Sequence, residues 1–180
     1  MALIALLLAA PAHAAVTAPS IAVVDQTAVL QKSDAVGGIE KQFEGRRKAF
    51  QDEVTKQEAA LKASEEELKK KSASLAPEAF KKERDAFEAK VGAAQKKVGD
   101  MKSSLDADYG KALGVVQRNM LQIIADIAKE EGVNLVISNR QVILFAPELD
   151  ITDSVVKKLN EKLPKVDVNE ATKSEKAPKE

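Results

Sequence analysis

The sequence predicts a mainly helical α+β protein, in which a long antiparallel helical hairpin with coiled-coil-like arms stands on a small β-core. Apolar residues recur at helical spacing over residues 34–131, with one interruption near 74–78. Short β-branched segments lie on both sides of that stretch and favour strands. Aromatic residues make up only 3% of the chain and charged residues 31%. This composition is typical of long helices stabilised by association rather than of a large globular core.

The N-terminus resembles a secretory signal peptide over residues 1–14. An apolar run from Leu3 to Ala10 precedes Ala12-His13-Ala14, a small-x-small cleavage site. The run is shorter than the roughly 20 residues that a membrane-spanning helix needs. No basic residue precedes it, which is unusual for a signal, and an uncleaved anchor is the alternative. We expect cleavage and a mature chain that begins at Ala15, outside the cytoplasm.

The residue types of the mature chain exclude several chemistries. Cleavage removes His13, the only histidine, and the chain has no Cys and no Trp. A thiol or imidazole nucleophile, a Cys/His zinc site and a disulfide are therefore excluded. No paired acids, phosphate-binding Gly-rich loop or metal-ligand cluster is apparent in the sequence. We expect no enzymatic activity, no cofactor, no metal and no nucleic-acid partner.

Residues 15–33 are predicted to form the first part of the β-core. Ile21 to Asp25 is a β-branched run that is too short for a helix and favours a strand. Thr27 is placed to cap a short helical turn that ends at Leu30.

The outgoing helix of the predicted hairpin has an incomplete apolar seam. One half of the seam is spaced by seven residues: Val54, Leu61, Leu68 and Leu75. The other half begins with apolar residues and then loses them: Phe43, Phe50, Gln57, Ser64 and Lys71. We expect a weak, poorly filled coiled coil on this side. Pro77 ends the helix and suits the first turn of the next one.

The returning helix is more regular and is predicted to stop at Glu131-Gly132. Its seam follows 4-3 spacing: Phe80, Arg84, Phe87, Val91, Ala94, Val98, Met101, Leu105, Asp108, Ala112 and Val115. The seam then shifts to Val116, Met120, Ile123 and Ile127, as in a heptad stutter. Arg84 and Asp108 are interpreted as polar residues that set the register of the helices. Four glycines within this helix favour flexible arms: Gly92, Gly99, Gly110 and Gly114.

Residues 132–163 are predicted to complete the core with a β-hairpin and a helix. Val133–Ser138 and Val142–Ala146 are interpreted as two strands joined by a short polar turn. Thr152 is expected to cap the amphipathic helix, and the polar residues 164–180 are predicted to form a disordered tail. Three short strands and one helix bury too little apolar surface for independent stability, so we expect several copies to share one core. The residues themselves do not determine how many.

Two segments carry a resemblance to a known family. They are IAVVDQTAVLQKSDAVGGIEKQFE near the start and GVNLVISNRQVILFAPELDITDSVVKKLN near the end. Together with the helical hairpin between them, they resemble the Skp (OmpH-like) periplasmic chaperones over nearly all of the mature chain except the tail. The resemblance implies a homotrimer in which a shared β-barrel body carries three helical arms around a cavity. It implies a periplasmic chaperone that holds unfolded outer-membrane proteins without ATP before their insertion.

The resemblance also places particular residues. Five would help form the trimer core: Val23, Leu135, Ile137, Ile143 and Phe145. Four apolar residues would lie toward the arm ends: Leu68, Leu75, Phe80 and Phe87. These four are interpreted first as seam residues, and as client contacts where the seam is incomplete. Well-known members are strongly basic, whereas this chain has a formal net charge of zero, so we assign no lipopolysaccharide site.

The zero net charge conceals a basic hairpin tip. Residues 69–102 carry ten basic and five acidic side chains, a local net charge of +5. Lys81, Lys82 and Arg84 are therefore candidate contacts for acidic clients or for an anionic membrane surface. The alternative is a solvated helix face with ordinary intrahelical ion pairs. Two other functions stay open at this stage: an envelope adaptor coiled coil that binds a folded partner, and a membrane-surface protein.

Overall fold

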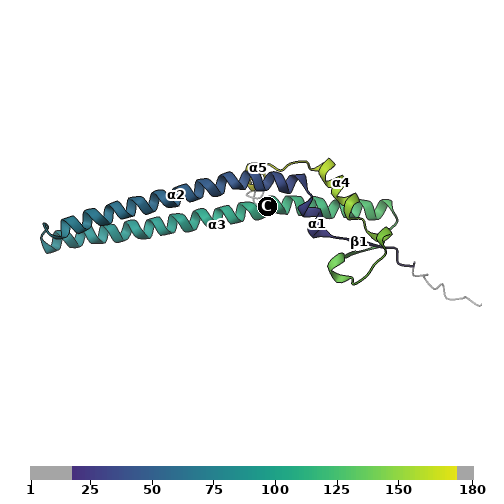
Figure 1. The fold of residues 1–180 in the computed structure, drawn as a ribbon, viewed down its shortest axis with the longest axis horizontal. Coiled ribbons are helices and arrows are strands. Elements are labelled where there is room, and N and C mark those ends of the chain that lie inside the picture. Colours follow the sequence, from purple (N-terminus) through teal and green to yellow (C-terminus); the bar gives the residue numbers. More distant parts are fainter. Residues whose placement is uncertain (1–17, 174–180) are drawn as a thin grey trace, which may run out of the picture.

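The computed structural model describes residues 18–173. Two long helices lie side by side and antiparallel, with a small sheet and the shorter helices at one end (Figure 1). The elements are β1 (Ile21–Val24), α1 (Gln26–Gln31), α2 (Asp34–Ser72), α3 (Pro77–Glu130), β2 (Leu135–Ser138), α4 (Thr152–Lys162) and α5 (Val168–Lys173). Short 3₁₀ turns, η1 (Asn139–Gln141) and η2 (Pro147–Leu149), lie between β2 and α4. The predicted helical hairpin is confirmed, while the signal peptide predicted at residues 1–14 lies outside the described residues.

The hairpin turns and stops at the residues that the sequence predicts. Helix α2 ends at Ser72, and Pro77 occupies the first turn of α3, where its missing N–H costs nothing. Glu78 lies in the same turn, where its negative charge interacts favourably with the positive end of the helix dipole. At the other end of α3, Gly132 has a φ of 68°, a left-handed conformation that glycine adopts without strain.

The sheet differs from the prediction. Strand β2 pairs in parallel with β1 in the register Ile21–Leu135 to Val24–Ser138, so the helical hairpin is the crossover between them. The predicted β-hairpin of 133–138 and 142–146 is wrong in this chain. After β2 the backbone enters η1, and residues 142–146, with a bend at Ile143, form no strand and have no strand partner among the described residues. One edge of β2 pairs with β1, and its other edge has no strand partner among the described residues.

The core lies at the base of the hairpin. Buried side chains from every helix and from β1 meet there: Ala22, Val24, Val29, Ala35, Ile39, Phe43, Ala112, Val116, Met120, Ile123, Ile124, Ile127, Ile151, Val155 and Leu159, joined by Val166, Val168 and Ala171 of the tail. The predicted seam shift in α3 is confirmed, because Val116 is fully buried while Val115 is only partly buried.

Two helix caps were predicted on the wrong residue. Asp25, not Thr27, caps α1 by accepting a hydrogen bond from the Ala28 N–H at 2.9 Å. At α4, the Asp150 carboxylate accepts from the Thr152 N–H at 2.8 Å. The Thr152 hydroxyl instead accepts a hydrogen bond from the Asp25 N–H at 2.9 Å, so it joins α4 to the start of α1.

The predicted disordered tail is wrong for residues 164–173. This segment includes helix α5, and Val166, Val168 and Ala171 are buried against the base of the hairpin. Figure 1 shows α5 beside α2 and α3, on the arm side of α1 and α4. Residues 174–180 lie outside the described part of the chain.

Candidate functional site

The distal arm, defined as residues 47–107, is a helix pair with a poorly filled seam. Among its described residues only Ala94 is buried. One gap in this seam has a volume of about 360 Å³ and is lined by Gln57, Ala60, Leu61, Ser64, Lys90, Ala93, Ala94 and Lys97. Small and polar side chains leave this space because they do not reach across the interface. The predicted poor filling near Gln57 and Ser64 is confirmed.

Two smaller openings interrupt the seam on either side of that gap. One, of about 70 Å³, lies between Leu68 and Lys71 of α2 and Phe87 of α3. The other, of about 280 Å³, lies toward the base and includes Arg46 and Asp108 in its walls. The helices of the distal arm therefore touch intermittently, and their apolar side chains stay partly accessible to solvent.

The hairpin tip combines an exposed leucine with a basic surface. Leu75 is 37% exposed, whereas Leu68, Phe80 and Phe87 are partly buried. Leu68 and Phe87 line one opening from opposite helices, which confirms their interpretation as seam residues. The Lys71 ammonium and the Glu83 carboxylate form a cross-hairpin ion pair at 2.8 Å beside them.

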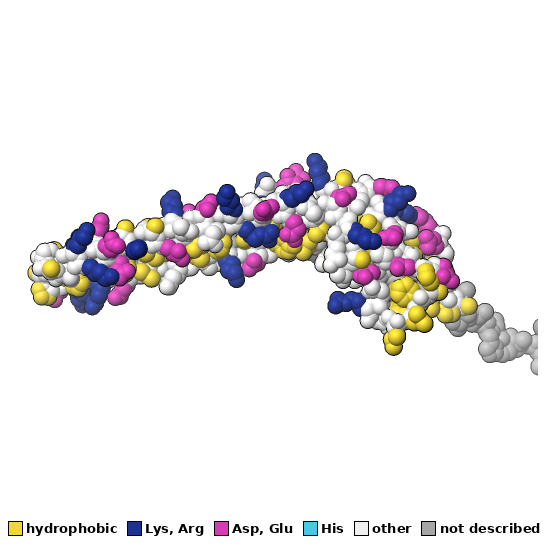
Figure 2. All heavy atoms as spheres, in the orientation of Figure 1, with side chains coloured by type: hydrophobic (Ala, Val, Ile, Leu, Met, Phe, Trp, Pro, Cys, Tyr) yellow, Lys and Arg dark blue, Asp and Glu magenta, His cyan; other side chains and the backbone are white. Residues whose placement is uncertain are grey.

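The three predicted basic contacts at the tip are exposed. Arg84 lies 3.5 Å from Asp85 and 3.6 Å from Glu88 on its own helix. Its predicted role in setting the register is therefore wrong. Within the described residues, Lys81 and Lys82 form no ion pair. Basic and acidic groups alternate along the visible face of the arm in Figure 2.

The joint between the distal arm and the base contains an aromatic and polar network. The rings of Phe43 and Tyr109 meet edge to face with centroids 5.1 Å apart. The Arg46 guanidinium lies 5.2 Å above the Phe43 ring and 3.1 Å from the Asp108 carboxylate. Asp108 of α3 is therefore joined to α2 by an ion pair, and its role in setting the register stays a prediction.

A second pair of titrating groups lies in the same joint. The Tyr109 hydroxyl donates a hydrogen bond to the Glu40 carboxylate. This bond, followed by the neighbouring Arg47 guanidinium at 3.2 Å, lowers the pKa of Glu40. The same bond and partial burial raise the pKa of Tyr109. Glu40 and Tyr109 come from α2 and α3, so their bond also depends on the approach of the two helices.

The second candidate surface is the apolar base face: Ile21, Val23, Leu135, Ile137, Ile143 and Leu144. In the parallel register, Ile21 lies beside Leu135 and Val23 beside Ile137. Side chains alternate along a strand, so these four share the sheet face opposite the one that packs on the core. Figure 2 shows hydrophobic side chains gathered on this end of the molecule.

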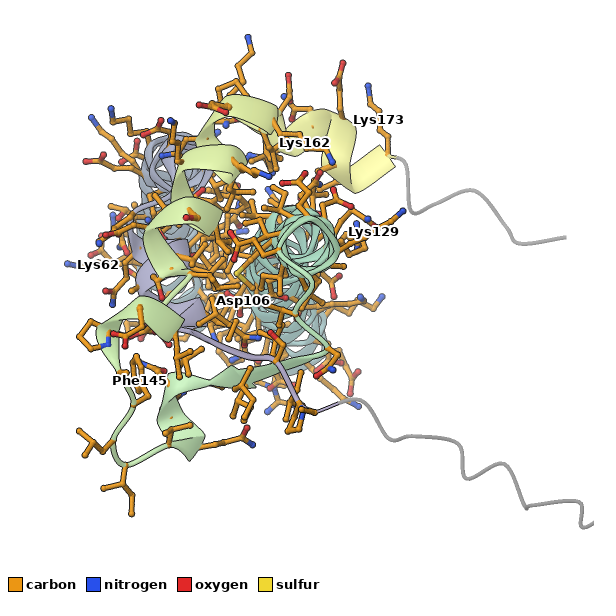
Figure 3. The ribbon with its side chains drawn as sticks, turned by 90° about the vertical axis from the view of Figure 1, so that its right-hand side faces the viewer. Lys62, Asp106, Lys129, Phe145, Lys162 and Lys173 are labelled. Carbon is orange, nitrogen blue, oxygen red and sulfur yellow. The ribbon has the colours of Figure 1, made fainter. Side chains whose placement is uncertain are left out.

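The exposure of the base face is uneven. Ile143 is 106% exposed, Leu144 86% and Leu135 45%. Val23 is buried within the chain, and Ile137 and Phe145 are partly buried. Figure 3 looks at the molecule from the base end and places Phe145 on the extended segment below the helices. Three of the six side chains that make up the base face are thus substantially exposed.

Two exposed apolar residues were not predicted. Leu144 belongs to the apolar run 142–146, and its exposure follows from the extended backbone there. Leu121 on α3 is 55% exposed beside a groove of about 350 Å³ formed with Leu30, Gln26 and Thr27 of the α1 region. Leu121 follows Met120 by one residue and so lies off the buried face that Met120 shares with Ile123 and Ile127. A leucine at such a position is visible in the sequence and could have indicated an exposed apolar residue.

The described residues contain no group of His, Cys, Asp and Glu side chains that could hold a metal ion. Among the helices of residues 18–173, none is long and apolar enough to cross a membrane.

The fold and the two surfaces define a class of protein: a long two-helix arm that projects from a small base with an exposed apolar face. Residues 20–159 match the family described as outer membrane protein (OmpH-like). The chain therefore belongs to the OmpH-like family, and the resemblance seen in the two terminal segments is confirmed.

A solved structure has the same fold. It is the 2.83 Å crystal structure of a candidate outer membrane chaperone (OmpH-like) from Caulobacter crescentus CB15. The two proteins align with a TM-score of 0.74 and 20% sequence identity, over 84% of this chain and 89% of that chain. No curated protein matches the sequence.

Proposed function

We propose that this protein is an ATP-independent periplasmic holding chaperone. In this proposal it encloses unfolded outer-membrane β-barrel proteins between its helical arms and prevents their aggregation before membrane insertion. Membership of the OmpH-like family supports the chaperone role, as does the description of the Caulobacter relative as a candidate outer membrane chaperone. The periplasmic location rests on the predicted signal peptide. N-terminal sequencing of the exported protein is expected to begin at Ala15.

One observation carries the proposal: the distal arm buries a single side chain, Ala94, along about sixty described residues. An arm built to present one fixed surface would need a filled seam. Here the gaps leave leucine and phenylalanine side chains partly accessible to solvent and allow the two helices to move. An unfolded chain offers many apolar side chains in changing positions, and such an arm can contact several of them weakly.

The homotrimer is part of the same proposal. The apolar base face exposes Ile143, Leu144 and Leu135 in a single chain, and large exposed apolar patches mark association sites. Three copies joined through these faces would bury them and pair the second edge of β2. Three arms around one cavity then bind a client with a combined affinity that exceeds that of one arm. Release requires no fuel, because insertion of the client into the membrane removes its unfolded form.

The deciding experiment is light scattering of the mature chain, alone and with a urea-diluted outer-membrane β-barrel protein. We expect a trimer mass that increases by the mass of one client, together with suppressed turbidity. A trimer that leaves client aggregation unchanged would instead support an envelope adaptor that binds a folded partner.

Assembly is tested separately with the double variant Ile143→Asp and Leu144→Asp. Two buried charges without partners are costly, so we expect the variant to scatter as a monomer. The matched control is Leu75→Asp, which makes the same kind of change at the exposed tip, far from the base face. We expect it to remain a trimer. A trimer in the double variant would contradict the role of the base face.

Contact with an anionic membrane surface at the tip is the second partner that we propose. Lys81 and Lys82 are exposed and form no ion pair within the described residues. Near an anionic surface each such charge contributes about 1 kcal/mol. Lys81→Gln with Lys82→Gln is expected to weaken binding to vesicles that contain anionic lipid. Lys157→Gln, an exposed change at the base, is the control. Equal binding by all three proteins would rule out the tip contact.

A further inference from the structure

The C-terminal strap, defined as residues 164–173, packs on the base of the arm. It lies beyond the part of the chain that matches the OmpH-like family, which ends at residue 159. Val168 is completely buried, and Val166 and Ala171 are almost so, in the same core as Ile39 and Phe43 of α2. The strap contacts α3 as well, so it bridges both helices of the hairpin.

The side chain of Gln42 holds the backbone of the strap at two points. Its amide Nε2 donates a hydrogen bond to the Val166 carbonyl at 2.8 Å, and its Oε1 accepts one from the Val168 N–H at 3.2 Å. A glutamine amide has one donor end and one acceptor end, so this pairing matches a single orientation of the strap. The interaction therefore fixes the strap on α2 in register.

Arg46 joins the strap to the joint of the arm. Its Nη2 donates to the Asn169 side chain at 2.6 Å, while its Nη1 donates to Asp108 of α3 at 3.1 Å. The same guanidinium lies over the Phe43 ring. One side chain of α2 thus contacts both α3 and α5. If α5 detached, the Arg46 guanidinium would lose its hydrogen bond to Asn169, and its bond to Asp108 would be less constrained.

The strap crosses the hairpin where the continuous core gives way to the gapped arm. Phe43 and Ala112 are buried on the base side of this line. Arg46 and Asp108 line the first opening on its distal side. A change in the approach of α2 and α3 here is amplified along the whole length of the arm, because the helices beyond it are long and nearly straight (Figure 1).

We propose that the C-terminal strap is a reversible brace that sets the angle and stiffness of the arm at its base. Its attachment is small: a six-residue helix, three short apolar side chains and a few hydrogen bonds. Segments with so few buried contacts open more readily than the core around them. Strap release therefore frees the joint without unfolding the base. The strap acts on the mechanics of the arm in the same way whichever ligand the arm binds.

The test uses the full-length chain with Val168→Asp, which places a charge in the buried position of the strap. Glu170→Ala, an exposed change on the same helix, is the matched control. The chain has no native cysteine, so spin labels at Lys62→Cys on the arm and Lys157→Cys on α4 report the arm angle. Labelled chains are diluted with unlabelled ones so that distances within one chain are measured.

We expect Val168→Asp to broaden the distance distribution and to raise amide exchange of residues 105–112 about tenfold. Glu170→Ala is expected to match the parent protein in both measurements. If Val168→Asp lowers the helix content seen by circular dichroism, Gln42→Leu serves instead, because it removes both backbone contacts and leaves the strap sequence intact. Rapid exchange confined to residues 164–173, with an unchanged distance distribution, would overturn the proposal.

Discussion

At the base of the hairpin, α2 and α3 bury Ile39, Phe43, Ala112, Val116 and further apolar residues in a shared core. In the distal arm the same two helices bury only Ala94 among their described residues. The base is supported by α1, α4, α5 and the sheet, whereas within residues 18–173 no third element packs on the arm. One pair of helices is therefore closely packed at one end and loosely packed at the other.

This contrast gives each region a different response to substitution. In a close-packed core, a removed side chain leaves a cavity and its former neighbours lose contacts. In a seam that already contains openings, the removal of a side chain costs less stability, because that side chain made fewer contacts. The largest difference in the free energy of unfolding is therefore expected when the same substitution is made once in the base and once in the arm.

Phe43→Ala is expected to have the largest effect on stability. Phe43 is 1% exposed and contacts Tyr109 edge to face, so its truncation should lower the free energy of unfolding by about 3–5 kcal/mol. Phe50→Ala, one heptad further along α2, removes a partly buried ring from the side of an opening. We expect it to cost about 1 kcal/mol. Urea unfolding at one fixed protein concentration compares the two. Equal losses would show that the arm is packed as tightly as the base.

Stiffening the arm is the second test and should have an effect of about 1 kcal/mol at each site. A Cβ added at Gly92 or Gly99 would meet no atom within 4 Å, so Gly92→Ala and Gly99→Ala should stabilise α3 through its helix propensity. Amide exchange in the arm should slow, and capture of large unfolded clients should slow with it. Gly132→Ala is the contrasting control. It is expected to destabilise the protein, because Gly132 has a φ of 68°. Unchanged capture kinetics would remove the link between arm flexibility and capture.

The sequence predicts the arm better than the base. Helical spacing, Pro77 and Gly132 are local signals, and they determine where the helices begin and end. The seam openings near Gln57 and Ser64 were predictable because the loss of apolar residues at heptad positions is visible in the sequence. Two seam residues depart from the pattern: Arg84 pairs with its own helix, and Leu75 is exposed.

The base depends on contacts between distant residues, which local patterns do not contain. Strand β2 lies only a few residues before segment 142–146 in the sequence, yet it pairs with β1, more than a hundred residues away. The strap was missed because most of its residues are polar, and its burial rests on the spacing of Val166, Val168 and Ala171 against Gln42. The exposure of Ile143 and Leu144 is likewise a property of the folded chain.

Two titrating groups at the joint, Glu40 and Tyr109, give its stability a modest dependence on pH. The pKa of Glu40 lies below its ordinary value of 4.5, so its contribution to stability is full above that value and is lost as the pH falls through the lowered pKa. The pKa of Tyr109 lies above its ordinary value of 10.0. Its contribution is full below pH 10.0 and is lost as the pH rises through the raised value.

Glu40→Gln should therefore weaken the protein near neutral pH by less than about 1 kcal/mol, since Glu40 is half-exposed. It should also reduce the loss of stability between about pH 5 and 3. The urea midpoint measured across this range checks both expectations. Glu44→Gln, an exposed glutamate on the same helix, is the control. If both variants follow the pH profile of the parent, the bond between Glu40 and Tyr109 does not stabilise the joint.

The smallest expected effect lies at the far end of the arm. The Lys71–Glu83 pair crosses the hairpin at 2.8 Å, but its side chains are 44% and 45% exposed. A double-mutant cycle with Lys71→Gln and Glu83→Gln should give a small coupling that falls as salt is added, because both side chains are largely solvated. The Lys69–Glu65 pair, which lies within α2, is the matched cycle, because it cannot report on contact between the helices. If a bound client separates the two helices, the Lys71–Glu83 coupling should weaken, whereas the Lys69–Glu65 coupling should stay the same. A coupling of several kcal/mol would instead mean that the tip is clamped shut, and the contrast between a rigid base and an adaptable arm would not hold.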